Sequence, residues 1–408
     1  MHLYGKYDSD IDQSVYNVPF GETSPFTKMV RLKLLYYMIK GPLRDGGCDL
    51  EVNRMLLNGS LLAFFPLHNL DYLYGVTSRI RSWTSMPWNQ PLDEMREYFG
   101  EKFALYNAFL GHFTYYLIIP AIIGLAFQIE VWKTGNLSHP VMPFFAVVIT
   151  FWSVSMLETW KGQQATLAMR WGMLGFENEE PDRPEFVGIP TTSHINGKEI
   201  VYFPRFESFK RFTLSAFSIM SYILLCIGVV GSIYYLRFAM QKNSAIGASA
   251  LASVLNTVQI TIFNAIYQKI VTKLTDLENH RTDTQYEDSL IGKLFCFQFV
   301  NSYASFFYIA FLAQWLQPPP DAASDLKGQC GDVNCMLPLA MNLAIVFGTR
   351  LVVTNFAELL VPLISFTDRR AKEIEGIEDV TKVTPAEDNF MRLKYDSMYD
   401  SIKNYSDT

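Results

Sequence analysis

Long stretches without any charged residue decide what this chain can fold into. No Asp, Glu, Lys or Arg occurs between Lys102 and Glu130. Further uncharged stretches cover residues 138–157, 212–236, 243–268 and 294–320. About 20 apolar residues in a helix span the hydrocarbon core of a bilayer, so each stretch predicts a transmembrane helix. A single soluble domain, a disordered chain and a disulfide scaffold are excluded.

We therefore expect an all-α polytopic membrane protein with six transmembrane helices and a partial αβ cytosolic segment at the amino terminus. The expected spans cover about residues 103–131, 138–158, 212–236, 243–268, 294–317 and 333–367. The sixth span is less apolar than the others, because it contains Arg350 and Glu358. We interpret it as one long helix.

The segments outside the spans are mixed in composition. Within residues 1–100, we expect an amphipathic helix over 26–39, a strand over 60–66 and a polar helix over 91–100. Residues 177–204 contain four prolines and predict a surface loop, and residues 369–408 predict a charged cytosolic tail.

The basic residues indicate the orientation. With six spans, all but five of the 34 Lys and Arg residues fall on the side of the two termini. Basic residues mark cytoplasmic loops, so both termini are expected in the cytoplasm, with the protein in the plasma membrane or the endoplasmic reticulum. The net charge of −6 and the lack of a dense basic run make nucleic acid an unlikely partner.

Polar side chains at membrane depth are the informative residues of such a chain. One helical face of the fourth span and one of the fifth carry them. These residues are Ser249, Ser253, Asn256, Thr257, Asn264 and Gln268, then Gln298, Asn301, Ser302, Ser305 and Tyr308. We favour a hydrophilic furrow, because amides are bulkier than close packing requires. The alternative is helix packing through interhelical hydrogen bonds.

Arg350, Thr354 and Glu358 are spaced by four and share one face of the sixth span. A carboxylate within the membrane is costly unless it is paired. Glu358 with Asn355 or Thr354 offers oxygen ligands that suit Ca²⁺. An ion pair with another helix, or a position near the cytoplasmic water, is the alternative.

Other polar residues suggest little chemistry. Cys330 and Cys335 fall in an outer loop, where they form either a disulfide or two unpaired thiols. His112 lies within the first span and suits packing or contact with water. No nucleophile with a base, phosphate loop or zinc motif is present in the sequence, so an enzyme is not expected.

Several segments together resemble the anoctamin family. They are residues 58–68 (NGSLLAFFPLH), 90–93 (QPLD), 96–102 (REYFGEK), 105–106 (LY), 157–161 (LETWK), 168–171 (AMRW), 297–303 (FQFVNSY) and 307–311 (FYIAF). The most specific is residues 278–289 (ENHRTDTQYEDS). The likeness covers most of residues 25–368.

The resemblance implies calcium-activated chloride channels or phospholipid scramblases that work as homodimers of ten-span subunits. Each subunit of the family has a furrow bounded partly by its third to seventh helices, with membrane lipids and chloride or other small ions as partners. A glycine hinge of the family falls on Gly348 and a calcium ligand on Glu358. Thr354 occupies the place of the family's asparagine ligand, and Asn355 follows it.

The family's last four spans have no counterpart, and residues 395–400 (YDSMYD) resemble the segment before its seventh helix. We therefore expect a fragment that ends after the sixth of ten helices, with an incomplete calcium site, and do not expect these residues alone to be calcium-gated. A non-conducting membrane tether, a regulatory subunit or an inactive fragment is the alternative to passive transport.

Overall fold

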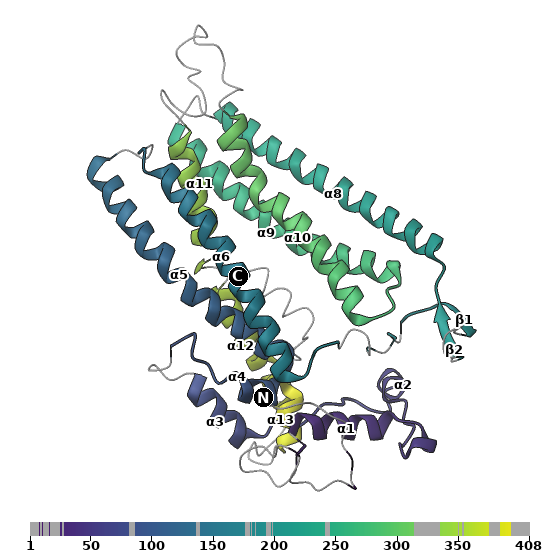
Figure 1. Cartoon of the computed structure of the whole chain (residues 1–408). Helices are drawn as coiled ribbons and strands as arrows, with labels where there is room; N and C mark the ends of the chain where they lie inside the picture. Colours follow the sequence, from purple (N-terminus) through teal and green to yellow (C-terminus); the bar gives the residue numbers. More distant parts are fainter. Residues whose placement is uncertain are drawn as a thin grey trace. The chain divides into compact units, whose positions relative to one another are not determined.

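The structure of the chain is a computed structural model. It describes residues 8, 10, 16, 25–26, 28–80, 86–135, 139–175, 180, 182–183, 185–192, 197, 199–240, 245–313, 335–349, 351–352, 355–374 and 384–392. Apart from one short hairpin, the regular elements in these ranges are helices (Figure 1). The chain divides into two compact units, residues 1–174 with 361–408 and residues 175–360.

The first unit begins with short helices and continues into two long ones. They are α1 (Lys28–Lys40), a 3₁₀ turn (Leu43–Asp45), α2 (Val52–Leu57), α3 (Leu70–Ile80), α4 (Leu92–Phe99), α5 (Glu101–Thr134) and α6 (Met142–Trp171). A small core of Val76, Met95, Ala104 and Trp171 joins α3, α4 and the two long helices. The Trp171 indole also donates to Asp93 Oδ1 at 3.2 Å.

Two of the three elements expected before the membrane are helices, α1 and α4, although α1 lacks the single apolar face of an amphipathic helix and buries no residue. The strand expected over residues 60–66 is wrong, and with it the αβ character of this segment in its described part. Residues 62–66 are exposed or half-exposed irregular chain that pairs with no strand among the described residues, and Pro66 has no N–H for a ladder. An apolar run becomes a strand only where a partner strand accepts its hydrogen bonds.

Helices α5 and α6 pack along each other and share side-chain bonds to backbone. The Trp152 indole donates to the carbonyl of Tyr116 at 2.8 Å. His112 Nε2 lies 3.1 Å from the carbonyl of Met156. His112 is buried and therefore has the packing role expected of it. Gly135 ends α5 with a positive φ of 65°, a conformation that glycine adopts without a steric penalty.

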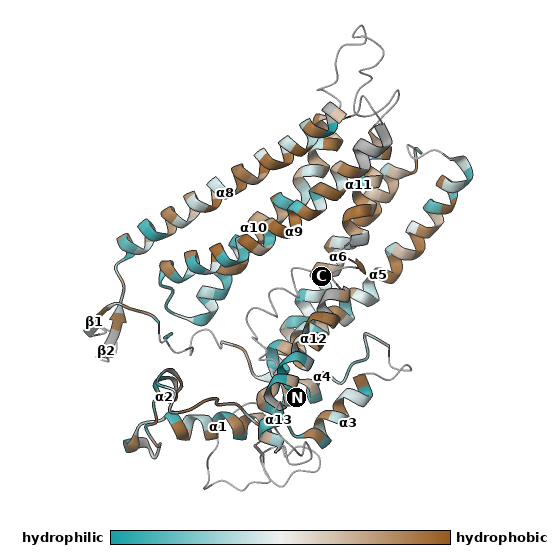
Figure 2. Ribbon diagram, turned by 180° about the vertical axis from the view of Figure 1, so that it is seen from behind, coloured by the Kyte–Doolittle hydropathy of each residue, from teal (hydrophilic) through white to brown (hydrophobic). Residues whose placement is uncertain are grey.

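The second unit begins with a hairpin of β1 (Ile189–Thr192) and β2 (Glu199–Tyr202), paired antiparallel. The predicted surface loop over residues 177–204 thus contains two short strands. Then follow α8 (Arg205–Met240), α9 (Ala245–Glu278), α10 (Asp283–Phe307), a π-helical turn (Tyr308–Leu312) and α11 (Met336–Thr349). Helix α9 contacts α8, α10 and α11. The end of α8 near the hairpin is hydrophilic and the rest is mostly hydrophobic (Figure 2).

Four helical segments in the described residues are long and apolar enough to cross a membrane. They are Glu101–Thr134, Met142–Trp171, Arg205–Arg237 and Asp283–Leu312. Helix α9 has 34 residues and α11 has 14, and neither is among these four segments. Six spans therefore stay a prediction.

In the range of the sixth expected span, the described residues form three helical pieces. The structure describes α11, a π-type pair at Leu351 and Val352, and α12 (Asn355–Ile374). Residues 350 and 353–354 lie outside the described residues, so one long helix stays a prediction. The remaining element is α13 (Pro385–Met391), which lies within the predicted tail and begins with a capping box between Thr384 and Glu387.

Candidate functional site

The polar stripes of α9 and α10 face each other around Asn301, which is fully buried. Its Oδ1 accepts hydrogen bonds from Gln259 Nε2 at 2.9 Å and from the Cys226 thiol at 3.1 Å. Its Nδ2 donates to Asn264 Oδ1 at 2.8 Å and to the carbonyl of Ile260 at 3.2 Å. One amide thus connects three helices, α8, α9 and α10.

A second polar group lies one helical turn away and includes α11. The side chains of Asn256 in α9, Ser305 in α10 and Asn342 in α11 are fully buried. Asn256 Nδ2 and Asn342 Nδ2 each lie 3.2 Å from Ser305 Oγ and donate to it. We name the two groups together the amide cluster: Cys226, Asn256, Gln259, Asn264, Asn301, Ser305 and Asn342.

The other predicted furrow residues lie around this cluster. Ser253 and Ser302 are buried, whereas Thr257, Gln268, Gln298 and Tyr308 are half-buried. The side chain of Ser249 lies outside the described residues. The Tyr308 ring packs at a tilt against Tyr234 of α8, with 4.6 Å between ring centroids. Of the eleven predicted residues, the structure joins Asn256, Asn264, Asn301 and Ser305 by side-chain hydrogen bonds.

A buried ionic cluster lies at the turn between α9 and α10. Lys293 Nζ is 2.5 Å from Glu278 Oε2 and also donates to Ser289 Oγ at 2.6 Å and Thr275 Oγ1 at 3.2 Å. The side chains of Lys293 and Glu278 are only 8% and 3% exposed. His280 Nε2 lies 2.8 Å from the same carboxylate oxygen.

The pKa of Glu278 reflects this environment. Burial raises the pKa of the carboxyl, but hydrogen bonds from His280 and Lys293 outweigh the burial and lower the pKa to about 2. Glu278 therefore carries its charge at any physiological pH.

The segment before the hairpin is fastened to the same turn. The Glu180 carboxylate accepts from the backbone N–H of Thr284 at 3.1 Å, in the first turn of α10. The Arg183 guanidinium pairs with Asp283 at 3.0 Å and lies 4.0 Å from the centre of the Tyr286 ring. These contacts join residues about a hundred positions apart in sequence.

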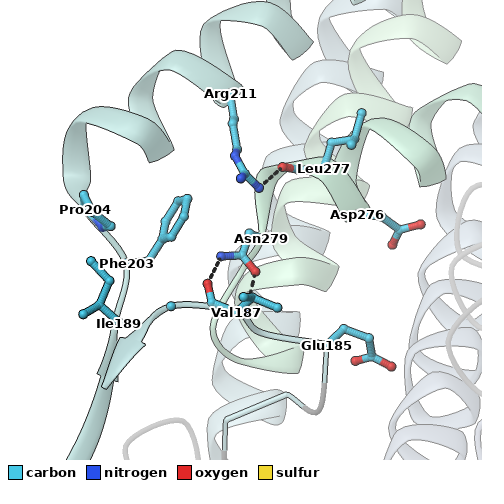
Figure 3. A pocket seen from close by; sticks show the side chains of 10 residues that line it. Glu185, Val187, Ile189, Phe203, Pro204, Arg211, Asp276, Leu277 and Asn279 are labelled. Carbon is cyan, nitrogen blue, oxygen red and sulfur yellow. Dashed lines mark hydrogen bonds between the residues drawn. The ribbon is translucent and has the colours of Figure 1, made fainter. Parts of the chain in front are cut away.

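Asn279 completes this fastening (Figure 3). Its side chain accepts from the backbone N–H of Val187 at 3.0 Å and donates to the carbonyl of Val187 at 2.8 Å. Asn279 has a φ of 59°, which asparagine tolerates better than most residues. The two bonds reproduce the pairing of a strand neighbour.

An open pocket of about 600 Å³ lies beside Asn279 (Figure 3). It is lined by Glu185, Val187, Gly188, Ile189, Phe203, Pro204, Arg211, Asp276, Leu277 and Asn279. The Arg211 guanidinium donates to the carbonyl of Leu277 at 3.0 Å and lies over Phe203. Arg211 is already hydrogen-bonded, and the carboxylates of Glu185 and Asp276 also line the pocket. The pocket therefore favours neither an anion nor a cation as a ligand.

The predicted calcium ligands cannot be placed as a site. Glu358 and Asn355 belong to α12, but their side chains lie outside the described part, as do Thr354 and Arg350 altogether. In the described ranges, no three His, Cys, Asp or Glu side chains form a group that could hold a metal. Gly348 lies in the last turn of α11, where an added Cβ would meet no atom within 4 Å.

Sequence reasoning missed several members of these clusters. Gln259 follows Asn256 by three residues, and Asn342 is an isolated amide in an apolar stretch, so both carried a readable signal. Glu278 belongs to the family-like motif of residues 278–289, whereas Lys293 lies outside every segment singled out in the sequence. Their pairing depends on a turn of four residues between α9 and α10, where a longer segment was expected.

Comparison with known proteins decides the family. A family model described as "Anoctamin: Calcium-activated chloride channel" matches residues 95–407, which is more than half of the chain. The chain belongs to the anoctamin family. Together with the apolar helices, this makes it an integral membrane protein.

The relatives that this chain matches are themselves anoctamins, and each match covers a similar share of the two chains. Anoctamin-7 of Homo sapiens is 29% identical over 86% of the chain and 46% of its own length. Anoctamin-4 of Mus musculus is 28% identical over 86% of the chain and 45% of its own length. Anoctamin-3 of Mus musculus is 26% identical over 87% and 44%. The chain thus spans about half the length of the curated relatives it matches.

The most specific anoctamin-like motif now has a structural account. Residues 278–289 form the α9–α10 turn and the first turns of α10. Within them, Glu278 pairs with Lys293, Asn279 holds Val187, and Thr282 caps α10 by accepting from Gln285 N. The motif therefore builds the junction at this end of the helices.

Proposed function

We propose that this anoctamin is a passive conduit that moves chloride, phospholipid or both across a membrane under calcium control. The family description supports ion transport, and the resemblance adds lipid scrambling. The observation that carries the proposal is the amide cluster, which collects the polar residues of α9, α10 and α11 at one junction within otherwise apolar helices. A permeating ion or headgroup needs such groups in place of water.

The path we propose follows the two polar stripes along α9 and α10, with α11 as a third wall. In the conformation described, Asn301 and Ser305 are completely covered by neighbouring helices. We therefore assign this conformation to a closed conduit. The opening step must expose these side chains to water.

A second candidate has support from the same contacts. Asn301 donates a hydrogen bond to Asn264 on the neighbouring helix, as a residue that only holds helices together would do. A non-conducting membrane tether or regulatory subunit requires nothing more. The two functions differ in whether the cluster is ever reached by water.

Calcium control is proposed from the family description alone. Calcium takes six to eight oxygen ligands, whereas Glu358, Asn355 and Thr354 supply one carboxylate and two neutral side chains. These residues do not by themselves fit a calcium site, and no step of the transport is assigned to the metal. We propose only that Glu358 contributes one ligand.

The proposal is tested by a paired transport assay. The purified protein is reconstituted in liposomes, and scrambling of a fluorescent phospholipid and chloride efflux are measured with and without calcium. Calcium-dependent movement of either solute supports a conduit, and its chemical identity separates scramblase from channel. No movement of either one favours the tether.

A labelling experiment tests the path independently. Cysteines replace Asn264 and Asn301 singly, and a water-soluble thiol reagent is applied under transporting and resting conditions. Leu224→Cys, at an exposed position of α8, is the lipid-facing control. Labelling at Asn264 and Asn301 that rises under transporting conditions supports the furrow, and complete protection refutes it.

Assembly and orientation are proposals as well. We propose a homodimer, which chemical cross-linking of the protein in native membranes would detect as a doubled mass. Both termini are proposed to face the cytoplasm. Epitope tags at each end should be reached by antibody only after the membrane is permeabilised.

A further inference from the structure

Three amide oxygens of the amide cluster are buried and have no hydrogen-bond partner among the described residues. They are Asn256 Oδ1, Gln259 Oε1 and Asn342 Oδ1. Asn256 and Asn342 are 0% exposed and Gln259 is 7% exposed. A buried acceptor without a partner costs roughly 1–3 kcal/mol, so three such acceptors within two helical turns require an explanation.

The amide nitrogens of the same residues are all engaged. Asn256 Nδ2 and Asn342 Nδ2 donate to Ser305 Oγ, and Gln259 Nε2 donates to Asn301 Oδ1. Exchanging O and N in an amide does not remove the problem, because the NH₂ group would then face the unpartnered side. The Ser305 hydroxyl has one proton and can satisfy only one acceptor.

Two of the unpartnered oxygens lie near the same hydroxyl group, that of Ser305. The O and N atoms of a carboxamide are roughly 2.2 Å apart. Both Asn256 Oδ1 and Asn342 Oδ1 therefore lie within roughly 5.5 Å of Ser305 Oγ. Gln259 follows Asn256 by three residues, so its side chain projects from the same face of α9 one turn away.

We propose that this junction of α9, α10 and α11 binds internal water, which donates hydrogen bonds to the three amide oxygens. Water fits because it is small, donates two hydrogens and is found where buried polar groups lack partners. A cation fits less well, because every described member of the cluster is an uncharged side chain. An uncompensated charge in an apolar interior is far more costly than a water molecule.

Internal water would change the energetics of helix separation at this junction. The amide oxygens would already be hydrated when the helices are packed. Moving α11 away from α9 and α10 would then leave these oxygens hydrogen-bonded to water, as they already are when the helices are packed. The inference concerns the resting structure and holds whether or not the protein conducts.

Radiolytic hydroxyl labelling with mass spectrometry tests the proposal in the intact protein in nanodiscs. Tyr234 is 2% exposed, and its hydroxyl interacts with Ser305. Tyr267 is 1% exposed, and its hydroxyl donates to the carbonyl of Lys293 at 3.0 Å. The two tyrosines have equal intrinsic reactivity and equal burial, so only nearby water should distinguish them. We expect Tyr234 to be modified several-fold faster than Tyr267, and equal rates would overturn the proposal.

A variant locates the water. Asn342→Leu removes one acceptor and should lower the modification of Tyr234 several-fold while leaving Tyr267 unchanged. Ser218→Ala, which removes an exposed hydroxyl bonded to its own helix, is the control and should leave both rates unchanged. If Asn342→Leu does not fold, the ratio of the two tyrosines in the unmodified protein still decides. Rates that change when sodium is replaced by potassium or N-methylglucamine would identify a cation and overturn the assignment to water.

Discussion

Replacing Lys293 with methionine should destabilise the protein strongly. The substitution keeps the length of the side chain but removes the ammonium group that contacts Glu278, Ser289 and Thr275. Removing one partner of a buried ion pair costs about 3–5 kcal/mol, because the other charge is left buried and uncompensated. The same contacts, together with the hydrogen bond from His280, lower the pKa of Glu278 from 4.5 to about 2 and so favour the charged carboxylate.

Thermal unfolding in detergent measures this cost. At about 2–4 °C per kcal/mol for a unit of this size, Lys293→Met should lower Tm by about 6–20 °C. The double variant Lys293→Met with Glu278→Gln should recover most of the loss, because no charge remains buried. Lys161→Met is the matched control, since its ammonium lies 2.6 Å from Glu158 on an exposed surface. It should cost less than about 1 kcal/mol.

Two results would refute this reasoning. One is a similar loss in Lys293→Met and Lys161→Met, and the other is a double variant whose loss equals the sum of the single losses. The pH dependence gives a further check. The folded protein has the lower pKa at Glu278, so its contribution is complete above pH 4.5 and is lost as the pH falls toward 2. The difference in Tm between the unmodified protein and Glu278→Gln should shrink in that range.

Three other substitutions have expected effects. Asn301→Ala removes two accepted and two donated hydrogen bonds and should lower the free energy of unfolding by about 1–3 kcal/mol. Thermal unfolding measures this loss, and an unchanged Tm would mean that the network is not formed. Asn279→Gly keeps the positive φ but loses both bonds to Val187, so limited proteolysis should cut the β1–β2 hairpin faster, and unchanged cutting would contradict the role of Asn279. His112→Leu keeps the packing volume but loses the bond to Met156, and should cost about 1 kcal/mol in thermal unfolding, whereas a stabilised protein would contradict the assignment.

The long helices could be predicted from the sequence because their signal is local. An uncharged run of the right length specifies a helix in lipid by itself, so α5 and α8 cover the predicted ranges, and α6 and α10 overlap most of theirs. The strand expected over residues 60–66 failed because a strand depends on a partner elsewhere in the chain. The β1–β2 hairpin was missed for a related reason. Its flanking segment is held by Asn279, which lies far away in sequence.

The candidate site could be predicted only one helix at a time. The period of 3.6 residues correctly placed Asn301 and Ser305 on one face of α10. It could not show that Gln259 and Asn342 would meet them, because the rotation of each helix is set by packing against its neighbours. The pair of Glu278 and Lys293 was hidden for the same reason. Each residue alone is an ordinary charge at a helix end.

The burial of Asn301 is compatible with permanent packing and with a closed conduit, because both have the same contacts in one conformation. The distribution of bonds among the described residues nevertheless indicates where a conduit would open. Asn301 alone holds α8, α9 and α10 through four contacts, whereas α11 joins the amide cluster through one bond between Asn342 and Ser305. At about 1 kcal/mol or less for an interhelical hydrogen bond in a membrane, separating α11 costs fewer bonds than separating α9 from α10. A water-soluble thiol reagent should therefore reach Asn342→Cys under conditions in which Asn301→Cys is still protected. The reverse order would mean that α9 and α10 separate first and that α11 is not the moving wall.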